Sequence, residues 1–143
     1  MKKPSFRLMA ILLSSLVPIF FLGCAKPGEK VDVSAQIAAL KSADKDTRVN
    51  ACVELAKAGP KAASAVPALI PLLKDADAEV RKISSYALYE IGPEAKAAIP
   101  AVKEQLNDPD RFVVSQAINT LRAIDPTAKD LPTPPNVTTG VKP

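Results

Sequence analysis

The sequence lacks histidine altogether, and this absence removes several kinds of chemistry at once. Without an imidazole group there is no usual general base near neutral pH, no Cys–His or Ser–His nucleophile pair and no histidine-based metal site. The five glycines are scattered along the chain, so they cannot form the glycine-rich loop that holds a phosphate group. We therefore expect no catalytic residue, no metal site and no cofactor.

Aromatic residues are scarce as well, with no tryptophan, two tyrosines and four phenylalanines in 143 residues. A chain of this length suits one domain, whose core must then come from alanine, leucine, isoleucine and valine. Such small aliphatic side chains favour closely packed helices. Of the two cysteines, Cys24 belongs to an N-terminal segment in which its thiol is expected to carry lipid, which leaves Cys52 without a disulfide partner. We interpret Cys52 as a small, partly buried apolar residue.

Most of the chain also lacks an excess of one charge. The formal net charge is +4, but three of the 19 Lys and Arg residues and none of the 15 Asp and Glu residues lie within residues 1–23. The remainder is therefore nearly neutral. The basic balance is no evidence for nucleic-acid binding, and we expect none.

The N-terminus contains the parts of an export signal. Three basic residues precede an uncharged apolar run, residues 8–22, which is shorter than the roughly 20 residues that a membrane-spanning helix needs. The letters FLGC at positions 21–24 resemble a bacterial lipobox, in which a lipid is attached to the cysteine thiol and the chain is cut before it. We therefore predict a signal peptide over residues 1–23, lipid on Cys24 and an extracytoplasmic location, anchored to the envelope membrane of a bacterium.

Two further segments flank the part of the chain that has a helical pattern. Residues 24–33 show no periodic apolar residues and are interpreted as a lipidated tether that holds the rest close to the membrane. Residues 131–143 contain four prolines and are predicted to form a disordered, extended tail. The folded domain is therefore expected over residues 34–130.

Between these ends the sequence repeats itself with an offset of 33 residues. Leu55 recurs as Leu88 and Leu121, and the Gly-Pro pair at 59–60 recurs at 92–93. A constant period of this size is typical of a solenoid, in which each unit buries its apolar face against its neighbours.

Each unit is expected to contain a longer first helix, A, and a shorter second helix, B. The predicted A helices are residues 44–58, 77–91 and 109–124, and the predicted B helices are residues 34–41, 66–73 and 99–106. Their side-chain oxygens make Ser42, Asp75 and Asp108 the predicted N-caps of the A helices. The Gly-Pro pairs are predicted to end the first two A helices.

The middle unit carries a family resemblance. Its letters are DAEVR at 77–81, AL at 87–88, IGPEA at 91–95 and AIPAV at 98–102, and together they resemble a HEAT repeat of the short kind found in the phycobilisome lyase-like family. The resemblance extends over about residues 34–126. It implies an all-α fold, an α-solenoid of about three short A/B helix pairs, used for protein binding.

The same resemblance implies a structural role for two arginines. In HEAT-like proteins the residue that corresponds to Arg48 and Arg81 commonly pairs with an acid of a neighbouring repeat. Asp75 and Asp108 are the candidates here. We expect these pairs to hold repeats together rather than to bind a ligand.

Pairs of aspartates recur near the predicted A-helix starts and have two interpretations. The pairs are Asp44 with Asp46, Asp75 with Asp77, and Asp108 with Asp110. Such oxygen-rich spacing is where a calcium site would begin. Helix starts favour the same residues, however, and no complete metal loop follows. We favour capping.

Four residues are candidates for contact with a partner. Tyr86 and Tyr89 lie off the apolar stripe of their helix, where they either contact a partner or cover the helix flank. On the last A helix, Val114 and Ile118 belong to an apolar stripe at a chain end that has no proper B helix. Either the following segment folds back over this stripe, or the stripe recruits a partner or a second copy of the chain. We expect partial cover, with residual exposure at Ile118.

Together these features predict a membrane-tethered, extracytoplasmic scaffold that binds another protein and is not an enzyme. Two alternatives remain open: an accessory subunit that resembles the lyase-like repeat proteins and holds a small molecule or pigment, and a purely structural envelope lipoprotein. A closed apolar pocket would favour the small molecule, whereas a shallow groove would favour a protein partner.

Overall fold

The computed structural model describes residues 31–128 and 131–132 of the chain. Within these residues the protein is all-α, as the sequence predicts, with α-helices and 3₁₀ helices (η) and no strand. In chain order the elements are α1 (Val33–Ala39), α2 (Lys45–Ala58), η1 (Gly59–Ala65), α3 (Val66–Leu69), η2 (Ile70–Lys74), α4 (Ala78–Ile91), η3 (Gly92–Ala98), α5 (Ile99–Glu104), η4 (Gln105–Asn107) and α6 (Arg111–Ile124).

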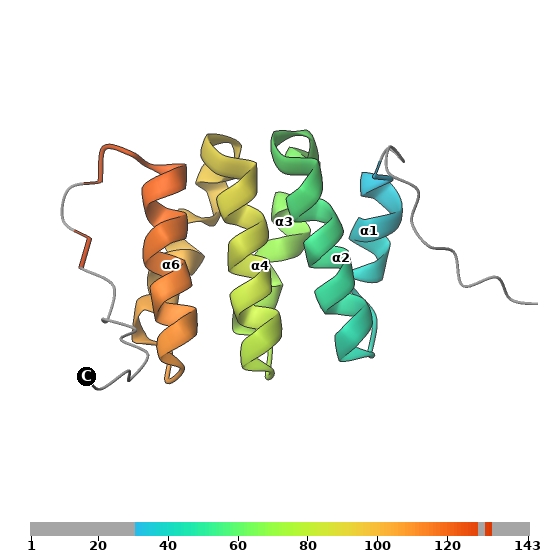
Figure 1. Ribbon diagram of the computed structural model, residues 1–143, viewed down its shortest axis with the longest axis horizontal. Helices are drawn as coiled ribbons and strands as arrows, with labels where there is room; N and C mark the ends of the chain where they lie inside the picture. Colours follow the sequence, from blue (N-terminus) through green and yellow to red (C-terminus); the bar gives the residue numbers. More distant parts are fainter. Residues whose placement is uncertain (1–30, 129–130, 133–143) are drawn as a thin grey trace, which may run out of the picture.

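The long helices α2, α4 and α6 stand side by side, with shorter helices behind them (Figure 1). Each long helix has 14 residues. Between two long helices the chain returns through a 3₁₀ segment, a short α-helix and a second 3₁₀ segment. Helix α1 packs beside α2 at one end of the stack. This arrangement confirms the predicted α-solenoid, in which α2, α4 and α6 are the A helices.

The N-caps of the long helices lie two residues after the predicted ones. The N-caps are Asp44, Asp77 and Asp110, and the side chain of each accepts a hydrogen bond from a backbone N–H of the first turn. The assignment of Ser42, Asp75 and Asp108 as caps is therefore wrong. Their side chains instead accept a hydrogen bond from the backbone N–H of the true cap, at 3.1, 3.0 and 2.9 Å respectively. Both positions favour a side-chain oxygen, so residue type alone does not distinguish them.

Two of the long helices end at glycines with positive φ. The angle is 57° at Gly59 and 70° at Gly92, in a region that residues with a side chain rarely adopt. The 3₁₀ helices η1 and η3 follow directly, and the sequence analysis missed them because a Gly-Pro pair resembles a loop. Behind the long helices, α3 changes to the 3₁₀ helix η2 at Ile70, next to Pro71, which lacks a backbone donor.

The core runs along the stack and is built from small aliphatic side chains, as expected. Leu55, Leu88 and Leu121 occupy equivalent positions in the three long helices and are 0, 0 and 1% exposed. Cys52 is fully buried, and this burial raises the pKa of its thiol to about 12. A protonated thiol is a poor nucleophile, so Cys52 acts as a small core residue.

Several predictions made for the chain ends lie outside the described residues. These are the signal peptide over residues 1–23, the lipid site Cys24 and most of the tail. Among the helices that the structure describes, none has the length and apolar character needed to cross a membrane.

Candidate interaction surface

Two tyrosines project from the outer side of α4, close to α6. Tyr86 and Tyr89 are three residues apart and therefore share one side of the helix. Their ring centroids are 6.1 Å apart and their planes differ by 15°, so the rings stack. A hydrogen bond to the Glu90 carboxylate raises the pKa of Tyr86. The two residues are 38 and 40% exposed, which leaves a flat aromatic surface open to solvent.

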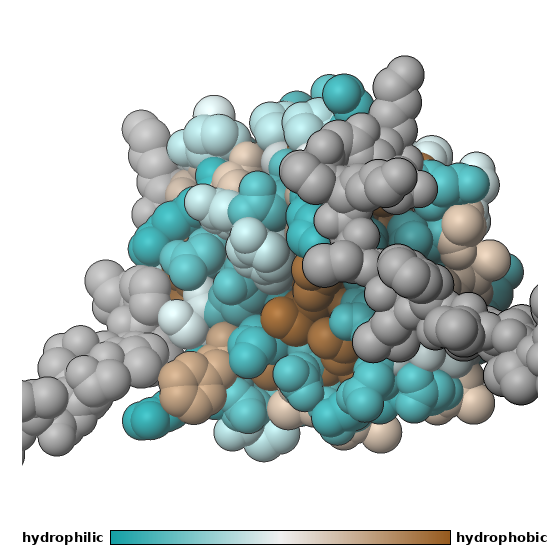
Figure 2. Space-filling model, turned by 45° about the vertical axis from the view of Figure 1, so that its right-hand side comes forward, coloured by the Kyte–Doolittle hydropathy of each residue, from teal (hydrophilic) through white to brown (hydrophobic). Residues whose placement is uncertain are grey.

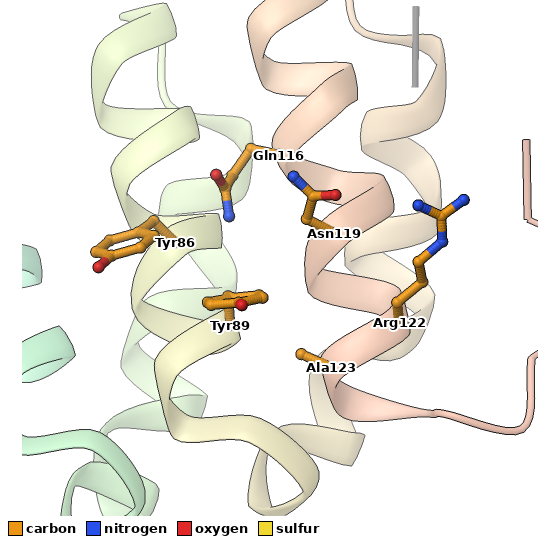
Figure 3. Close-up of a pocket in the computed structure, with 6 residues that line it drawn as sticks. All are labelled: Tyr86, Tyr89, Gln116, Asn119, Arg122 and Ala123. Carbon is orange, nitrogen blue, oxygen red and sulfur yellow. The ribbon is translucent and has the colours of Figure 1, made fainter. Parts of the chain in front are cut away.

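An open groove of about 610 Å³ lies between these tyrosines and the outer side of α6 (Figure 3). We call it the aromatic groove, and its lining residues are Tyr86, Tyr89, Gln116, Asn119, Arg122 and Ala123. Figure 3 shows that the Gln116 side chain extends from α6 toward α4, whereas the Arg122 guanidinium points away from the tyrosines.

The α6 side of the aromatic groove supplies polar groups. Gln116 Nε2 donates a hydrogen bond to Thr120 Oγ1 at 3.3 Å, and Arg122 Nη2 donates one to the Pro132 carbonyl at 3.4 Å. Asn119 is exposed on the same side of the helix. Amide and guanidinium groups can bind backbone carbonyls and carboxylates, while the stacked rings offer apolar contact. This combination suits a protein surface or a peptide.

A buried pair of hydroxyl groups lies between α4 and α6. Ser85 Oγ is 3.1 Å from Thr120 Oγ1, and Thr120 Oγ1 is 2.9 Å from the Ser85 carbonyl oxygen. Both residues are 0% exposed. Hydrogen bonds between fully buried groups demand well-defined geometry, so this contact sets the distance between the two helices that form the groove.

A third aromatic residue extends the exposed apolar surface along α6. Phe112 is 46% exposed, and the Arg111 guanidinium lies 4.9 Å from its ring centroid. Its spacing of four and seven residues from Gln116 and Asn119 places it on their side of the helix. Within the described part of the chain, the exposed large hydrophobic residues are Tyr86, Tyr89 and Phe112. All three are carried by the two helices of this junction.

The arginines singled out from the sequence lie away from the groove, where they join consecutive repeats. Arg81 donates to Asp108 through Nε at 2.7 Å and Nη2 at 2.9 Å. Arg48 donates to Asp75 through Nη2 at 3.2 Å. Both expected ion pairs are thus present, and both arginines also donate to backbone carbonyls in the loop before their own helix.

The Arg81–Asp108 contact stabilises the charged forms of both groups. The hydrogen bond from Arg81 lowers the pKa of Asp108 below 3.8, and the same contact raises the pKa of Arg81. Their side chains are 13 and 8% exposed, so they leave little surface for a ligand. The geometry supports a structural role for this pair.

The prediction that Ile118 remains partly exposed is wrong. Ile118 is 1% exposed and Val114 is partly buried, so neither forms an open apolar patch. After α6, Leu131 is partly buried and packs against the core, although the sequence analysis placed it in the tail. Leu131 lies outside any helix and therefore carries no periodic pattern by which this packing could have been predicted.

The paired aspartates do not form a metal site in the structure. Asp44, Asp77 and Asp110 are occupied as N-caps, and Asp75 and Asp108 are paired with arginines. Across residues 31–128 and 131–132, no group of three or more candidate ligands is close enough to hold a metal ion.

The polar half of the aromatic groove was not identified from the sequence. Gln116, Asn119 and Arg122 resemble the solvated side of an ordinary surface helix when α6 is considered alone. A signal was available, however, because Asn119 and Arg122 lie 33 residues after Tyr86 and Tyr89. Equivalent positions in consecutive repeats face the same side of a solenoid, so the repeat offset could have located the groove.

The fold places the chain in the class of α-solenoid domains. The family model for HEAT repeats matches residues 33–122, more than half of the chain, so the chain belongs to the HEAT-repeat family. HEAT repeats generally mediate contacts between proteins.

One solved structure similar to this chain is the crystal structure of an engineered protein from the Northeast Structural Genomics Consortium. The identity is 26% and the TM-score is 0.56. The match covers 64% of this chain and 44% of the engineered chain, so this chain spans less than half of that protein. No curated protein matches the sequence.

Proposed function

We propose that this protein is a non-enzymatic scaffold that binds another protein through the aromatic groove. One observation carries the proposal: the exposed large hydrophobic residues of the described chain all belong to α4 and α6, the helices that form the groove. Exposed aromatic side chains next to arginine and amide groups are typical of binding surfaces. The lack of histidine in the sequence supports the non-enzymatic assignment.

Site-specific photocrosslinking in intact cells tests this proposal. A photoreactive phenylalanine analogue placed at Tyr89 is expected to crosslink a defined partner protein. The matched control carries the same analogue at Lys57, an exposed residue near the end of α2. Because Lys57 lies outside the groove, it is expected to give no such product.

A second variant separates binding from folding. Tyr86→Ala with Tyr89→Ala should abolish copurification of the partner identified at Tyr89 and leave the circular dichroism spectrum unchanged, because both side chains are exposed. Equal crosslinking at positions 57 and 89, or full binding by the double variant, would contradict the assignment of the groove.

We further propose that the scaffold is tethered outside the cytoplasm by lipid on Cys24. The basic residues, the apolar run and the lipobox-like letters at 21–24 support this proposal. Cells fed a labelled fatty-acid analogue should mark the wild type and spare Cys24→Ser. Equal labelling of the two proteins would remove the lipoprotein assignment.

A second candidate function has less support. It is the holding of a pigment or other small molecule, which the resemblance to phycobilisome lyase-like repeat proteins implies. The groove is open and partly polar, whereas a small molecule is usually enclosed by an apolar pocket. A purely structural role in the envelope predicts that the Tyr86→Ala, Tyr89→Ala variant keeps every interaction of the wild type, so the same experiment distinguishes it.

A further inference from the structure

The side of α6 that carries Ile118 corresponds to a surface that earlier repeats use for stacking. Ile118 lies 33 residues after Ser85 and is therefore its equivalent. Ser85 on α4 faces the next long helix, since its side chain contacts Thr120 of α6. Ile118 must therefore face the place where a further long helix would stack on α6.

This stacking surface is covered although α6 is the last helix that the structure describes. Ile118 and its neighbour on the apolar stripe, Leu121, are each 1% exposed. Beyond α6, in the described residues 131–132, the side chain of Leu131 packs against the core. Arg122 holds the same segment through its hydrogen bond to the Pro132 carbonyl.

We propose that Leu131 and Pro132 cap the solenoid at the stacking surface of α6, and so prevent a second copy of the chain from stacking there. The cap replaces the missing repeat with one apolar contact and a backbone hydrogen bond rather than with a helix pair. An uncovered solenoid end exposes core-type residues to water, which favours association. This proposal concerns the end of the stack and does not depend on the aromatic groove.

The opposite end of the molecule explains why a second copy is the competitor. Helix α1 has no long helix before it in the described chain, and its Val33 and Ile37 are partly buried apolar residues packed on the core. In Figure 2, in which the α1 end is turned forward, an apolar area lies between hydrophilic side chains on the visible part of the surface. An exposed α6 end and this α1 end would therefore offer apolar surfaces to each other in a head-to-tail contact.

The test uses the chain from residue 24 onward with Cys24→Ser, so that no lipid is attached. Leu131→Asp should release the cap, because a charge at a half-buried apolar contact is costly. We expect unchanged helical content by circular dichroism and a severalfold rise in the fluorescence of a dye that binds apolar surfaces. The weight-average mass in sedimentation should rise with concentration above that of the parent chain, because a head-to-tail contact leaves a free end on each assembly. Leu131→Met is the matched control and should behave like the parent.

Three outcomes would overturn the proposal. Unchanged dye fluorescence in Leu131→Asp would show that Leu131 hides no apolar surface. A rise in fluorescence without a rise in mass would remove the second copy as the competitor. If Leu131→Asp loses helical content, hydrogen exchange on Leu131→Ala decides: faster exchange confined to α6 supports the cap, and equally faster exchange in α2 overturns it.

Discussion

The α2–α4 junction and the α4–α6 junction are related by the 33-residue offset, yet equivalent positions hold different chemistry. Between α4 and α6, buried Ser85 contacts buried Thr120. The equivalent residues of the first junction are Cys52 and Ala87, which are also fully buried but make no such contact between hydroxyl groups. At these equivalent buried positions, a polar contact joins the helices of the second junction, whereas apolar side chains pack in the first.

On the outer side, the first junction has the polar contact and the second lacks it at the equivalent positions. Across the first junction, Lys45 Nζ lies 3.2 Å from Glu79 Oε2 and 3.8 Å from Asp77 Oδ2. The equivalents of Lys45 and Glu79 in the second junction are Ala78 and Phe112, which cannot form an ion pair. The buried Ser85–Thr120 contact joins the helices of the second junction. Its outer side chains therefore need not form ion pairs, and they line a groove instead. A repeat protein can thus gain a binding surface at one junction without changing its fold.

The largest effect on stability is expected at Leu88, a residue of α4, the helix that belongs to both junctions. Leu88 of α4 is fully buried between its neighbours, and α4 contacts both α2 and α6. Leu88→Ala should lower the free energy of unfolding by about 2 to 5 kcal/mol, because it removes buried methyl groups and leaves a cavity. Chemical denaturation measures this change. A loss below about 1 kcal/mol would contradict the central packing of α4 in both junctions.

The next effect separates the two arginine pairs. Arg81 donates two aligned hydrogen bonds to Asp108, whereas Arg48 donates one to Asp75 and its Nε lies 3.0 Å from Oδ2 without hydrogen-bond alignment. Arg81→Met should therefore lower the free energy of unfolding by about 2 kcal/mol, and Arg48→Met by less.

This comparison has an internal control. Both arginines also donate to two backbone carbonyls in the loop before their helix, and both variants lose those bonds. The difference between the two variants therefore reports the carboxylate contacts. Chemical denaturation measures both variants. If Arg48→Met lowers the free energy of unfolding more than Arg81→Met does, the Arg48–Asp75 contact is the stronger of the two.

Features that repeat in the sequence were the ones that could be predicted from it. The helical hairpins and the buried leucines follow from the 33-residue offset, because each repeat makes the same contact with its neighbour. The Arg–Asp pairs were implied by the resemblance to HEAT repeats. The caps were placed two residues early, since Asp75 and Asp77 both offer side-chain oxygens to backbone amides. Only backbone geometry decides which of them begins the helix.

Features that depend on non-repeating contacts were missed. The repeat offset places the tyrosines of α4 and the polar residues of α6 on one side of the stack, but it does not predict the open space between them. The burial of Ile118 was missed because its outer side has no further helix from which cover could be inferred. In both cases the missing information is the distance between segments rather than the character of a residue.

A smaller effect distinguishes the junctions by pH. The hydrogen bond from Arg81 holds the pKa of Asp108 below 3.8 in the folded protein. A lowered pKa means that Asp108 stabilises the fold above about pH 4 and that this stabilisation is lost as the pH falls through the folded value.

Asp108→Asn should therefore be less stable than the wild type at neutral pH, and the difference should shrink as the pH falls below about 4. The pKa values of Asp44, Asp77 and Asp125 are also lowered, but these residues are present in both proteins and their effect cancels in the difference. Denaturation midpoints across this range provide the measurement. A difference that stays constant with pH would show that the Asp108 carboxylate is not the stabilising species.

The smallest effect is expected on the outer side of the first junction. Lys45 and Glu79 have side chains 41 and 52% exposed, and water and salt screen an ion pair at such a surface. Lys45→Ala should leave the denaturation midpoint almost unchanged at physiological ionic strength, with a small decrease only in low salt.

The matched comparison is Ala78→Lys with Phe112→Glu, which places the same pair across the second junction. It should likewise leave stability almost unchanged, but it should weaken partner binding because Phe112 flanks the aromatic groove. A large loss of stability for Lys45→Ala would show that the outer ion pairs, rather than apolar packing, hold the first junction together.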